Sequence, residues 1–357
     1  MSAALILPYM LILHYIGEVA TGSRTPHALH MLCVLASRNR SRRLAHDPMS
    51  GRILVLGAAG RLGYVAAEAF REAGWSVKGL VRPGRAGAVP PKVEPVEAVT
   101  RDEAIAAAQG CDVVLNALNP IITEWQKNAL SLAYGAIAAA EANGATLLFP
   151  GSVWNYGRDM PPVLDENTPM RPTTRKGRMR VEIEQRIREA CDRGMRAIIL
   201  RAGDFFGGGR GSWLDLAIVK DISRNRLTYP GPLDIVHAWA YLPDFAAAMV
   251  LLAERRDRFA PFEAFGFPGH AMTGRALIDA IEAATKGSFN IRPMGWWLLK
   301  SIGQLTAFGR ELAELEYLWR VPHRISGEKL RSAIGEIPHT PLPDATSASL
   351  RALGYRL

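Results

Sequence analysis

The sequence is poor in cysteine, with only Cys33, Cys111 and Cys191 among 357 residues. These cysteines form no Cys-x-x-Cys pair and have no neighbouring histidine, which excludes a disulfide framework and the usual ligand spacing of a zinc site. An odd number of cysteines is typical of proteins in a reducing compartment. We therefore expect a cytoplasmic protein that holds no metal.

Lysine is also scarce, because only eight of the 43 basic residues are lysines. The net charge is +9, but no run of basic residues is interleaved with aromatic residues, as a nucleic-acid-binding face would require. The densest basic cluster, residues 38–43, precedes the part of the chain in which we expect the fold. We expect no nucleic acid partner.

A long hydrophobic run is missing as well. Residues 2–17 carry no charged side chain apart from His14, but they fall short of the roughly 20 residues that a membrane span needs, and Pro8 interrupts them. A secretory signal would begin with basic residues, which residues 1–8 lack. We expect no membrane partner, with a membrane-associated leader as the alternative interpretation.

Met49 begins the stretch Met-Ser-Gly-Arg-Ile-Leu-Val-Leu-Gly, a polar lead into a buried strand that is typical of the start of a nucleotide-binding domain. We therefore interpret residues 1–48 as a disordered extension or as a translation start assigned too early. The fold is expected to begin at Met49.

Short apolar runs then alternate with segments of helical length. Strands are expected at 53–56, 77–81, 112–116, 146–149 and 197–200, and helices at 61–73, 125–142, 177–193 and 243–255. Such alternation predicts a parallel sheet with helices on both faces. Glycine and proline clusters at 207–211 and 229–232 break the pattern and indicate a second lobe.

A glycine turn follows the first expected strand, with Gly57, Gly60 and Gly63 in the pattern GxxGxxG. In a strand, turn and helix unit these glycines allow a tight turn, close approach of a pyrophosphate, and packing of helix on strand. The helix that begins near Arg61 and Leu62 would hold the anion at its positive end. We predict a dinucleotide site, with a turn that serves packing alone as the alternative.

The second expected strand ends in Lys-Gly-Leu-Val-Arg-Pro-Gly-Arg, which contains no acidic residue to accept hydrogen bonds from a ribose 2′-hydroxyl. Arg82 and Arg85, together with Arg61, offer guanidinium groups suited to a 2′-phosphate. We therefore favour NADP, with NAD as the alternative cofactor. Asn116, Ala117 and Leu118 end a further strand, where small side chains would let the nicotinamide half lie along the backbone.

Taken together, these motifs resemble the extended short-chain dehydrogenase/reductase superfamily, in particular the NAD-dependent epimerase/dehydratase family. The resemblance includes Gly-Ser-Val-Trp-Asn-Tyr-Gly at 151–157, Arg-Ala-Gly-Asp-Phe-Phe-Gly at 201–207 and Tyr-Leu-Pro-Asp-Phe-Ala at 241–246. It implies a Rossmann-type fold and a Tyr-x-x-x-Lys catalytic pair. Here Lys176 stands at the Tyr position and Arg180 at the Lys position, one helical turn apart.

This replacement changes the chemistry, because a guanidinium cannot release a proton as a phenol does. Arg180 could still clamp the nicotinamide ribose, and Lys176 could act as an acid only if its pKa were lowered. Tyr156 is the second candidate for the proton donor, with a packing role as its alternative. Ser152 matches the family residue that hydrogen-bonds the substrate.

Several other polar residues are interpreted as structural. We assign no role to His237, His270 or His323, and we interpret Asp204 and Asp244 as turn and helix-cap residues. The segment of residues 296–299, Trp-Trp-Leu-Leu, is expected to be buried in the second lobe, with a membrane surface as a weaker alternative.

The sequence thus predicts an α/β protein with a Rossmann-type doubly wound parallel sheet and a smaller C-terminal substrate lobe. We assign residues 49–205 and 235–255 to the dinucleotide-binding domain, 206–234 and 256–340 to the lobe, and 341–357 to a tail. The expected function is that of an NAD(P)-dependent oxidoreductase or epimerase acting on a small carbonyl, hydroxyl or sugar-nucleotide substrate. A non-catalytic NADP-binding sensor is the alternative, and both are compatible with a homodimer.

Overall fold

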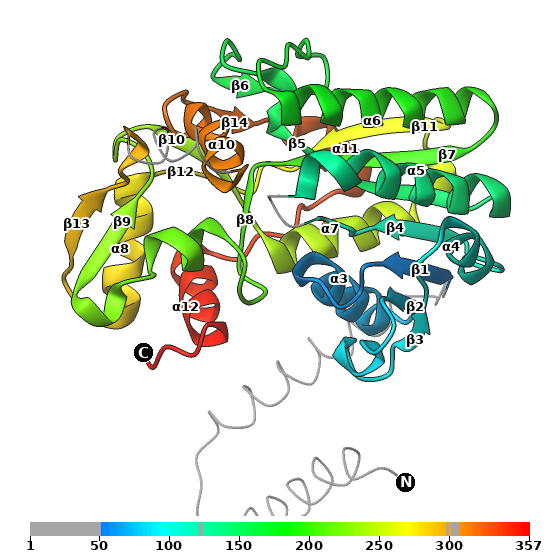
Figure 1. Cartoon of the computed structure of the whole chain (residues 1–357), viewed down its shortest axis with the longest axis horizontal. Helices are drawn as coiled ribbons and strands as arrows, with labels where there is room; N and C mark the ends of the chain where they lie inside the picture. Colours follow the sequence, from blue (N-terminus) through cyan, green and yellow to red (C-terminus); the bar gives the residue numbers. More distant parts are fainter. Residues whose placement is uncertain (1–50, 121–123, 298–299, 301–306) are drawn as a thin grey trace, which may run out of the picture. The chain divides into compact units, whose positions relative to one another are not determined.

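A seven-stranded parallel sheet organises the protein (Figure 1). The computed structural model describes residues 51–120, 124–297, 300 and 307–357, all within one compact unit, Ser50–Leu357. The strands are β1 (Arg52–Leu56), β2 (Ser76–Val81), β3 (Glu94–Glu97), β4 (Val113–Asn116), β5 (Thr146–Ser152), β7 (Arg196–Ala202) and β11 (Phe262–Gly266). Their order is β11-β7-β5-β4-β1-β2-β3, and every neighbouring pair is parallel. This order confirms the predicted Rossmann-type fold.

Helices cover both faces of the sheet, as Figure 1 shows. One face is covered by α3 (Arg61–Glu72), α7 (Leu242–Glu254) and α11 (Glu328–Ile334), and the other by α4 (Arg101–Ala107), α5 (Trp125–Asn143) and α6 (Arg175–Asp192). Side chains of β1 alternate between the two layers: Ile53 and Val55 pack against the first, Leu54 and Leu56 against the second. The continuous apolar run of this strand therefore reflects burial on both faces.

The second lobe is built from small sheets and helices around an aromatic core. It contains a sheet of β8 (Asp204–Phe206), β10 (Val236–Tyr241) and β12 (His270–Thr273), a pair of β9 (Arg226–Tyr229) and β13 (Asn290–Pro293), and the helices α8 (Gly274–Thr285) and α12 (Leu342–Ala352). Tyr229, Trp239 and Trp319 are buried in its core. The structure also contains a two-stranded sheet of β6 (Val163–Leu164) and β14 (Arg324–Ile325). The helix α10 (Ala307–Ala313) and the short helix η7 (Glu316–Trp319) precede β14 along the chain.

The sequence did not predict β3, α4 or β11. β3 is an edge strand of sequence Glu-Pro-Val-Glu, which lacks an apolar run, and α4 begins at a capping box formed by Thr100 and Glu103. β11 lies within the range 256–340 that the sequence assigns to the lobe, yet it pairs with β7 in the main sheet. The dinucleotide-binding part and the lobe are therefore more interleaved along the chain than the sequence suggests.

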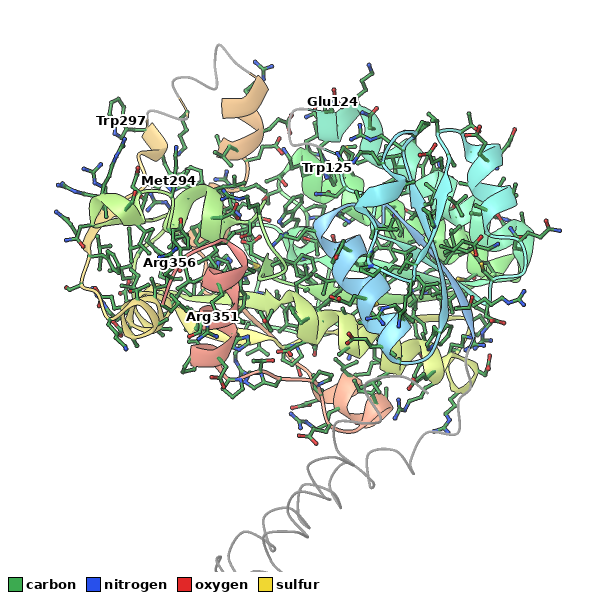
Figure 2. All side chains as sticks on the ribbon, turned by 90° about the horizontal axis from the view of Figure 1, so that it is seen from below. Glu124, Trp125, Met294, Trp297, Arg351 and Arg356 are labelled. Carbon is green, nitrogen blue, oxygen red and sulfur yellow. The ribbon has the colours of Figure 1, made fainter. Side chains whose placement is uncertain are left out.

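Trp296 and Trp297 differ in environment. Trp296 is buried and its indole N–H donates to the Pro230 carbonyl, whereas Trp297 is 74% exposed and lies at the periphery beside Met294 (Figure 2). The predicted burial of residues 296–299 is therefore confirmed for Trp296 and wrong for Trp297. Residues 298–299 and 1–48 lie outside the described residues, so the predictions for them stay untested. Within the described residues, no helix is long and apolar enough to span a membrane.

Candidate functional site

The candidate site lies where the strand order reverses, between β1 and β4. The helix after β1, α3, packs on one face of the sheet, and the helix after β4, α5, packs on the other. In open parallel sheets this divergence leaves a crevice at the carboxyl ends of the strands, where ligands bind. The two strand ends are joined here by a hydrogen bond of 3.0 Å from the Ala117 amide to the Leu56 carbonyl.

The glycine turn has the backbone geometry that a pyrophosphate site requires. Gly57 has φ of +83°, and a Cβ atom on Gly63 would lie 2.2 Å from the Gly57 carbonyl oxygen. Gly60 caps α3 without a side-chain hydrogen bond, and the first turn contains no acidic residue. The amides of Arg61, Leu62 and Gly63 thus begin a helix whose positive end is not neutralised by a side chain, so these residues fit a dinucleotide.

Arg61 connects the glycine turn to the second lobe. Its guanidinium donates to the carbonyls of Phe205 at 3.4 Å and Gly207 at 3.2 Å. Burial lowers the pKa of Arg61, and the carboxylates of Asp215 and Asp204 oppose this shift. Because the guanidinium is held by these carbonyls, the structure gives it a role in joining α3 to β8.

The expected 2′-phosphate site contains an acidic residue that the sequence did not predict. Arg82 and Arg85 are exposed after β2, in agreement with their expected position. Glu97, at the end of the neighbouring strand β3 and in register with Val81, accepts a hydrogen bond of 2.9 Å from the Gly84 amide. The sequence at the end of β2 gives no sign of Glu97, because the pairing of β3 with β2 is what brings Glu97 to this place.

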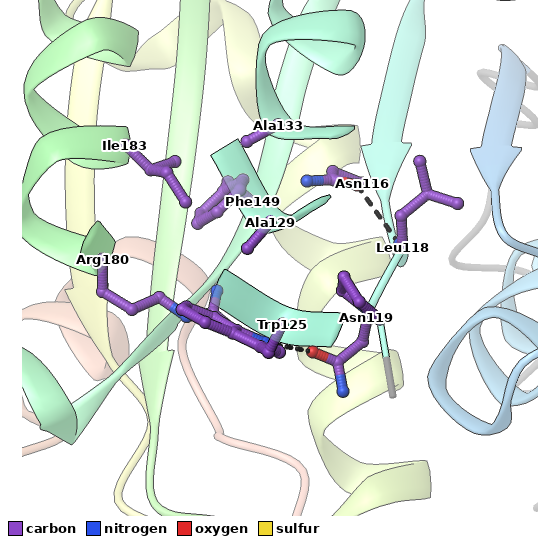
Figure 3. Close-up of a pocket in the computed structure, with 10 residues that line it drawn as sticks. Asn116, Leu118, Asn119, Trp125, Ala129, Ala133, Phe149, Arg180 and Ile183 are labelled. Carbon is purple, nitrogen blue, oxygen red and sulfur yellow. Dashed lines mark hydrogen bonds between the residues drawn. The ribbon is translucent and has the colours of Figure 1, made fainter. Parts of the chain in front are cut away.

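A pocket opens at the carboxyl ends of β4 and β5 (Figure 3). Its lining residues are Asn116, Leu118, Asn119, Pro120, Trp125, Ala129, Ala133, Phe149, Arg180 and Ile183. Asn116 accepts a hydrogen bond of 3.2 Å from the Leu118 amide, and the indole of Trp125 donates to Asn119 at 3.0 Å. The structure thus brings Asn116, Leu118 and Arg180 together and adds Trp125, which the sequence analysis missed.

Arg180 reaches this pocket from α6. Its guanidinium donates to the Pro150 carbonyl at 3.3 Å and lies near the rings of Trp125, Phe149 and Trp154, with centroid distances of 5.2, 5.9 and 5.8 Å. Burial lowers its pKa to about 10, although Glu184 opposes the shift. Nε has no hydrogen-bond partner among the described residues.

Lys176 lies one turn earlier on α6, but it contacts a different part of the protein. Its side chain is fully buried, and its ammonium donates to the carboxylate of Glu311 and, at 3.0 Å, to the Glu311 carbonyl. Glu314 lies 3.8 Å away. Lys176 therefore ties α6 to α10, a contact that the sequence could not reveal because the two helices are far apart along the chain.

Ser152 and Tyr156 occupy the loop after β5. The Ser152 hydroxyl accepts a hydrogen bond of 3.2 Å from the Trp154 amide, and Ser152 itself is half-buried at the carboxyl edge. Tyr156 is buried, and its hydroxyl donates to the Asp165 carbonyl at 3.3 Å. Burial raises the pKa of Tyr156; the charge of Arg201 opposes this shift and that of Glu184 adds to it.

Two aspartates differ from their sequence interpretation. Asp244 does not cap a helix: its carboxylate accepts hydrogen bonds of 2.7 Å from both the amide and the hydroxyl of Thr340. Asp204 forms a 2.9 Å contact with His237. Both partners are distant in sequence, so local cap and turn patterns could not identify them.

Within the described ranges, no group of three or more His, Cys, Asp or Glu side chains is placed to hold a metal.

His323 provides a prediction about pH. It is fully buried, and burial, with a further effect of His237, lowers its pKa to about 3. An unfolded chain binds this proton near pH 6.5, so the unfolded state gains protons as the pH falls from about 6.5 towards 3, and stability is lost in that window. We expect His323 to account for a loss of about 2 kcal/mol in the free energy of unfolding between pH 7 and pH 5.

Urea unfolding of the wild type and His323→Gln at these two pH values measures this contribution. The variant should lose less stability than the wild type on acidification. An equal loss in both proteins would contradict the assignment.

The sheet order, with the glycine turn at the switch point, defines a protein with a Rossmann-type fold. Residues 53–265 match the NAD dependent epimerase/dehydratase family, to which the chain therefore belongs. No curated protein matches the sequence.

Solved structures share the fold at low sequence identity. A putative epimerase from Burkholderia cenocepacia is 21% identical, with a TM-score of 0.67 and coverage of 86% of this chain and 99% of that one. The UDP-Glc/GlcNAc 4-epimerase from Campylobacter jejuni is 15% identical, with a TM-score of 0.66 and coverage of 85% and 99%. UDP-glucose 4-epimerase from Brucella ovis, in complex with NAD, is 15% identical, with a TM-score of 0.67 and coverage of 84% and 97%.

Proposed function

We propose that this protein binds a nicotinamide dinucleotide and uses it to oxidise or reduce a hydroxyl or carbonyl group of a small molecule. The observation that supports this most strongly is the glycine turn, in which Gly57 has a positive φ and Gly63 packs without room for a side chain at the start of α3. When bound, the dinucleotide supplies or accepts a hydride at its nicotinamide ring. Membership of the family supports the same reaction class.

The residues of the site then have distinct roles. The amides at the start of α3 bind the pyrophosphate, and the backbone of Asn116, Ala117 and Leu118 supports the nicotinamide half. Arg180 binds the adjoining ribose from the pocket, and Ser152 orients the substrate at the end of β5. The hydrogen bond of Tyr156 to Asp165 favours its packing role.

Lys176 supports the site indirectly. Its ammonium is held by Glu311, which favours a role in fixing α10 against α6 over one in proton transfer. We propose that its replacement affects turnover through the position of these helices.

The cofactor in this proposal is NADP, because Arg82 is exposed and is placed at the end of β2, where a 2′-phosphate would lie. Oε1 of Glu97 accepts a hydrogen bond from the Gly84 amide. We expect calorimetric titration to show tighter binding of NADPH than of NADH, and Arg82→Ala to weaken the binding of NADPH alone.

Arg351→Ala removes an exposed arginine from α12 and serves as the matched control, with unchanged affinities. Equal affinity of the wild type for NADPH and NADH would contradict the preference for NADP. So would a preference for NADPH that survives in Arg82→Ala.

The substrate class includes small carbonyl compounds, alcohols and sugar nucleotides. Sugar nucleotides belong in this class because the Campylobacter and Brucella proteins of the same fold are named as epimerases of UDP-sugars. A screen of such compounds for NADPH oxidation, NADP reduction and epimerisation tests the proposal. Turnover of at least one compound is the expected result.

A dinucleotide sensor is the second candidate function. The observation that favours it is Lys176, which replaces the family's tyrosine and is buried against Glu311. A sensor would bind NADPH with full affinity and show no turnover across the screen, whereas the proposed enzyme shows both.

A further inference from the structure

The buried His237 ring has both nitrogens engaged, and this fixes where its proton lies. Nδ1 lies 3.2 Å from the Leu318 carbonyl, and Nε2 lies 2.9 Å from Oδ2 of Asp204. A carbonyl oxygen only accepts hydrogen bonds, so Nδ1 carries a hydrogen. In a neutral ring, Nε2 would then present a lone pair to the Asp204 carboxylate.

Two lone pairs do not attract at 2.9 Å, so the contact requires a second proton between Nε2 and Oδ2. This proton resides either on the carboxyl group or on the imidazole. In both forms the pair holds one transferable proton and has no net charge. Stacking of His237 on Trp319, with ring centroids 4.4 Å apart at 8°, keeps the ring in the orientation that makes the contact.

Only one end of this pair is open. The His237 side chain is 2% exposed, whereas that of Asp204 is 15% exposed. Asp204 begins β8 two residues after Ala202, which pairs with Ser152 at the carboxyl edge of the main sheet. Asp204 therefore follows directly from the edge at which the substrate is proposed to bind.

A second observation concerns Tyr317, which interacts electrostatically with Asp204. Tyr317 is buried, and its hydroxyl has no hydrogen-bond partner among the described residues. Burial raises its pKa, and the charge of Asp204 adds to the effect. Buried hydroxyls are nearly always paired, so the Tyr317 hydroxyl leaves a hydrogen-bonding position open among the described residues.

We propose that Asp204 is the proton donor and acceptor of this site and that His237 is the residue that positions and recharges it. The proposal rests on the proposed function. It also explains how the chain could transfer protons although the family's tyrosine is replaced by Lys176, whose ammonium is held by Glu311.

The Asp204–His237 pair can supply or take up the proton that accompanies hydride transfer. When a carbonyl group is reduced, hydride adds to its carbon, the π electrons move to its oxygen, and Asp204 delivers the shared proton to that oxygen. The pair then regains a proton from water. In the oxidation of an alcohol, the pair first releases its shared proton to water, and Asp204 then accepts the hydroxyl proton as the hydride leaves the carbon.

The charged and titratable groups around the pair come from three elements and one loop. Arg61 of α3, Tyr229 of β9 and Tyr317 of η7 interact electrostatically with Asp204. His323, whose ring centroid lies 4.7 Å from that of His237, stays neutral above about pH 3 because burial lowers its pKa. These neighbouring groups therefore have to stay unchanged when the pH profiles of the Asp204 and His237 variants are compared with that of the wild type.

The first test uses the protein without added dinucleotide. Proton and nitrogen NMR of histidine-labelled protein should show a downfield proton shared between Nε2 of His237 and Asp204 that is lost in Asp204→Asn, whose amide cannot hold the shared proton. His270→Gln is the matched control, because His270 is also buried and bonds only a backbone carbonyl, that of Thr340. It should retain the resonance.

The second test uses a substrate found by the screen. We expect Asp204→Asn to lower kcat by about 100-fold or more, with the dissociation constant for NADPH unchanged within about twofold. His237→Gln should lower kcat less and shift its pH profile, and His270→Gln should do neither. Full activity of Asp204→Asn would overturn the proposal.

These tests distinguish a failure of the proposed function from a failure of the inference about Asp204. If the wild type neither binds a dinucleotide nor turns over a substrate, the proposed function fails, and the NMR result alone decides the inference. A His237 resonance that is absent from the wild type, or that persists in Asp204→Asn, would then overturn it. Its loss in Asp204→Asn, with circular dichroism unchanged, would support it.

Discussion

Replacing Lys176 with methionine should lower the free energy of unfolding by about 3–5 kcal/mol, because the carboxylate of Glu311 would remain buried without its partner. The Lys176 side chain is fully buried, and that of Glu311 is 9% exposed, so water cannot compensate for the lost charge. The effect should appear in urea denaturation as a lower midpoint with an unchanged slope.

The double variant Lys176→Met with Glu311→Leu separates the ion pair from packing. Because both charges are removed, we expect it to recover most of the lost stability. Arg186→Ala on the same helix breaks an exposed pair with Glu189 and should leave the unfolding curve unchanged. A single variant as stable as the wild type would contradict the buried ion pair.

Replacing Arg180 with alanine should weaken NADPH binding by about 1–3 kcal/mol, which corresponds to roughly 5- to 150-fold in the dissociation constant. Arg180 lines the pocket at the ends of β4 and β5, and its Nε has no partner, so a bound ribose could supply one. Isothermal titration with NADPH measures the change.

Arg178→Ala is the matched control, because this residue is exposed on the same helix. Its affinity for NADPH should equal that of the wild type. Arg180→Lys keeps the positive charge but loses the planar guanidinium that lies near the rings of Trp125 and Trp154, so we expect an intermediate affinity. An unchanged dissociation constant in Arg180→Ala would show that Arg180 does not contact the cofactor.

The fold could be predicted from the sequence because its signals are local. The run around Ile53 to Leu56 is buried on both faces, and Gly57 has the positive φ that its position in the turn requires. Edge elements give weaker signals, which is why the polar strand β3 was missed. Its residue Glu97 reaches the cofactor region only through pairing with β2.

The candidate site could be predicted only in part. The positions of Asn116 and Arg180 follow from strand ends and helical spacing, and the structure brings both to one pocket. Spacing alone also suggested that Lys176 shares this environment, but its partner Glu311 lies 135 residues away. The pairing of Asp204 with His237 is equally non-local, because it depends on the alignment of β8 with β10.

The central claim is that the glycine turn and the adjoining pocket bind a nicotinamide dinucleotide. A crystal structure of the protein soaked with NADPH tests it most directly. The account predicts the pyrophosphate at the amides that begin α3, the nicotinamide half along residues 116–118, and the guanidinium of Arg180 beside its ribose. A structure that shows NADPH bound away from the glycine turn, or no binding at saturating NADPH, would contradict the account.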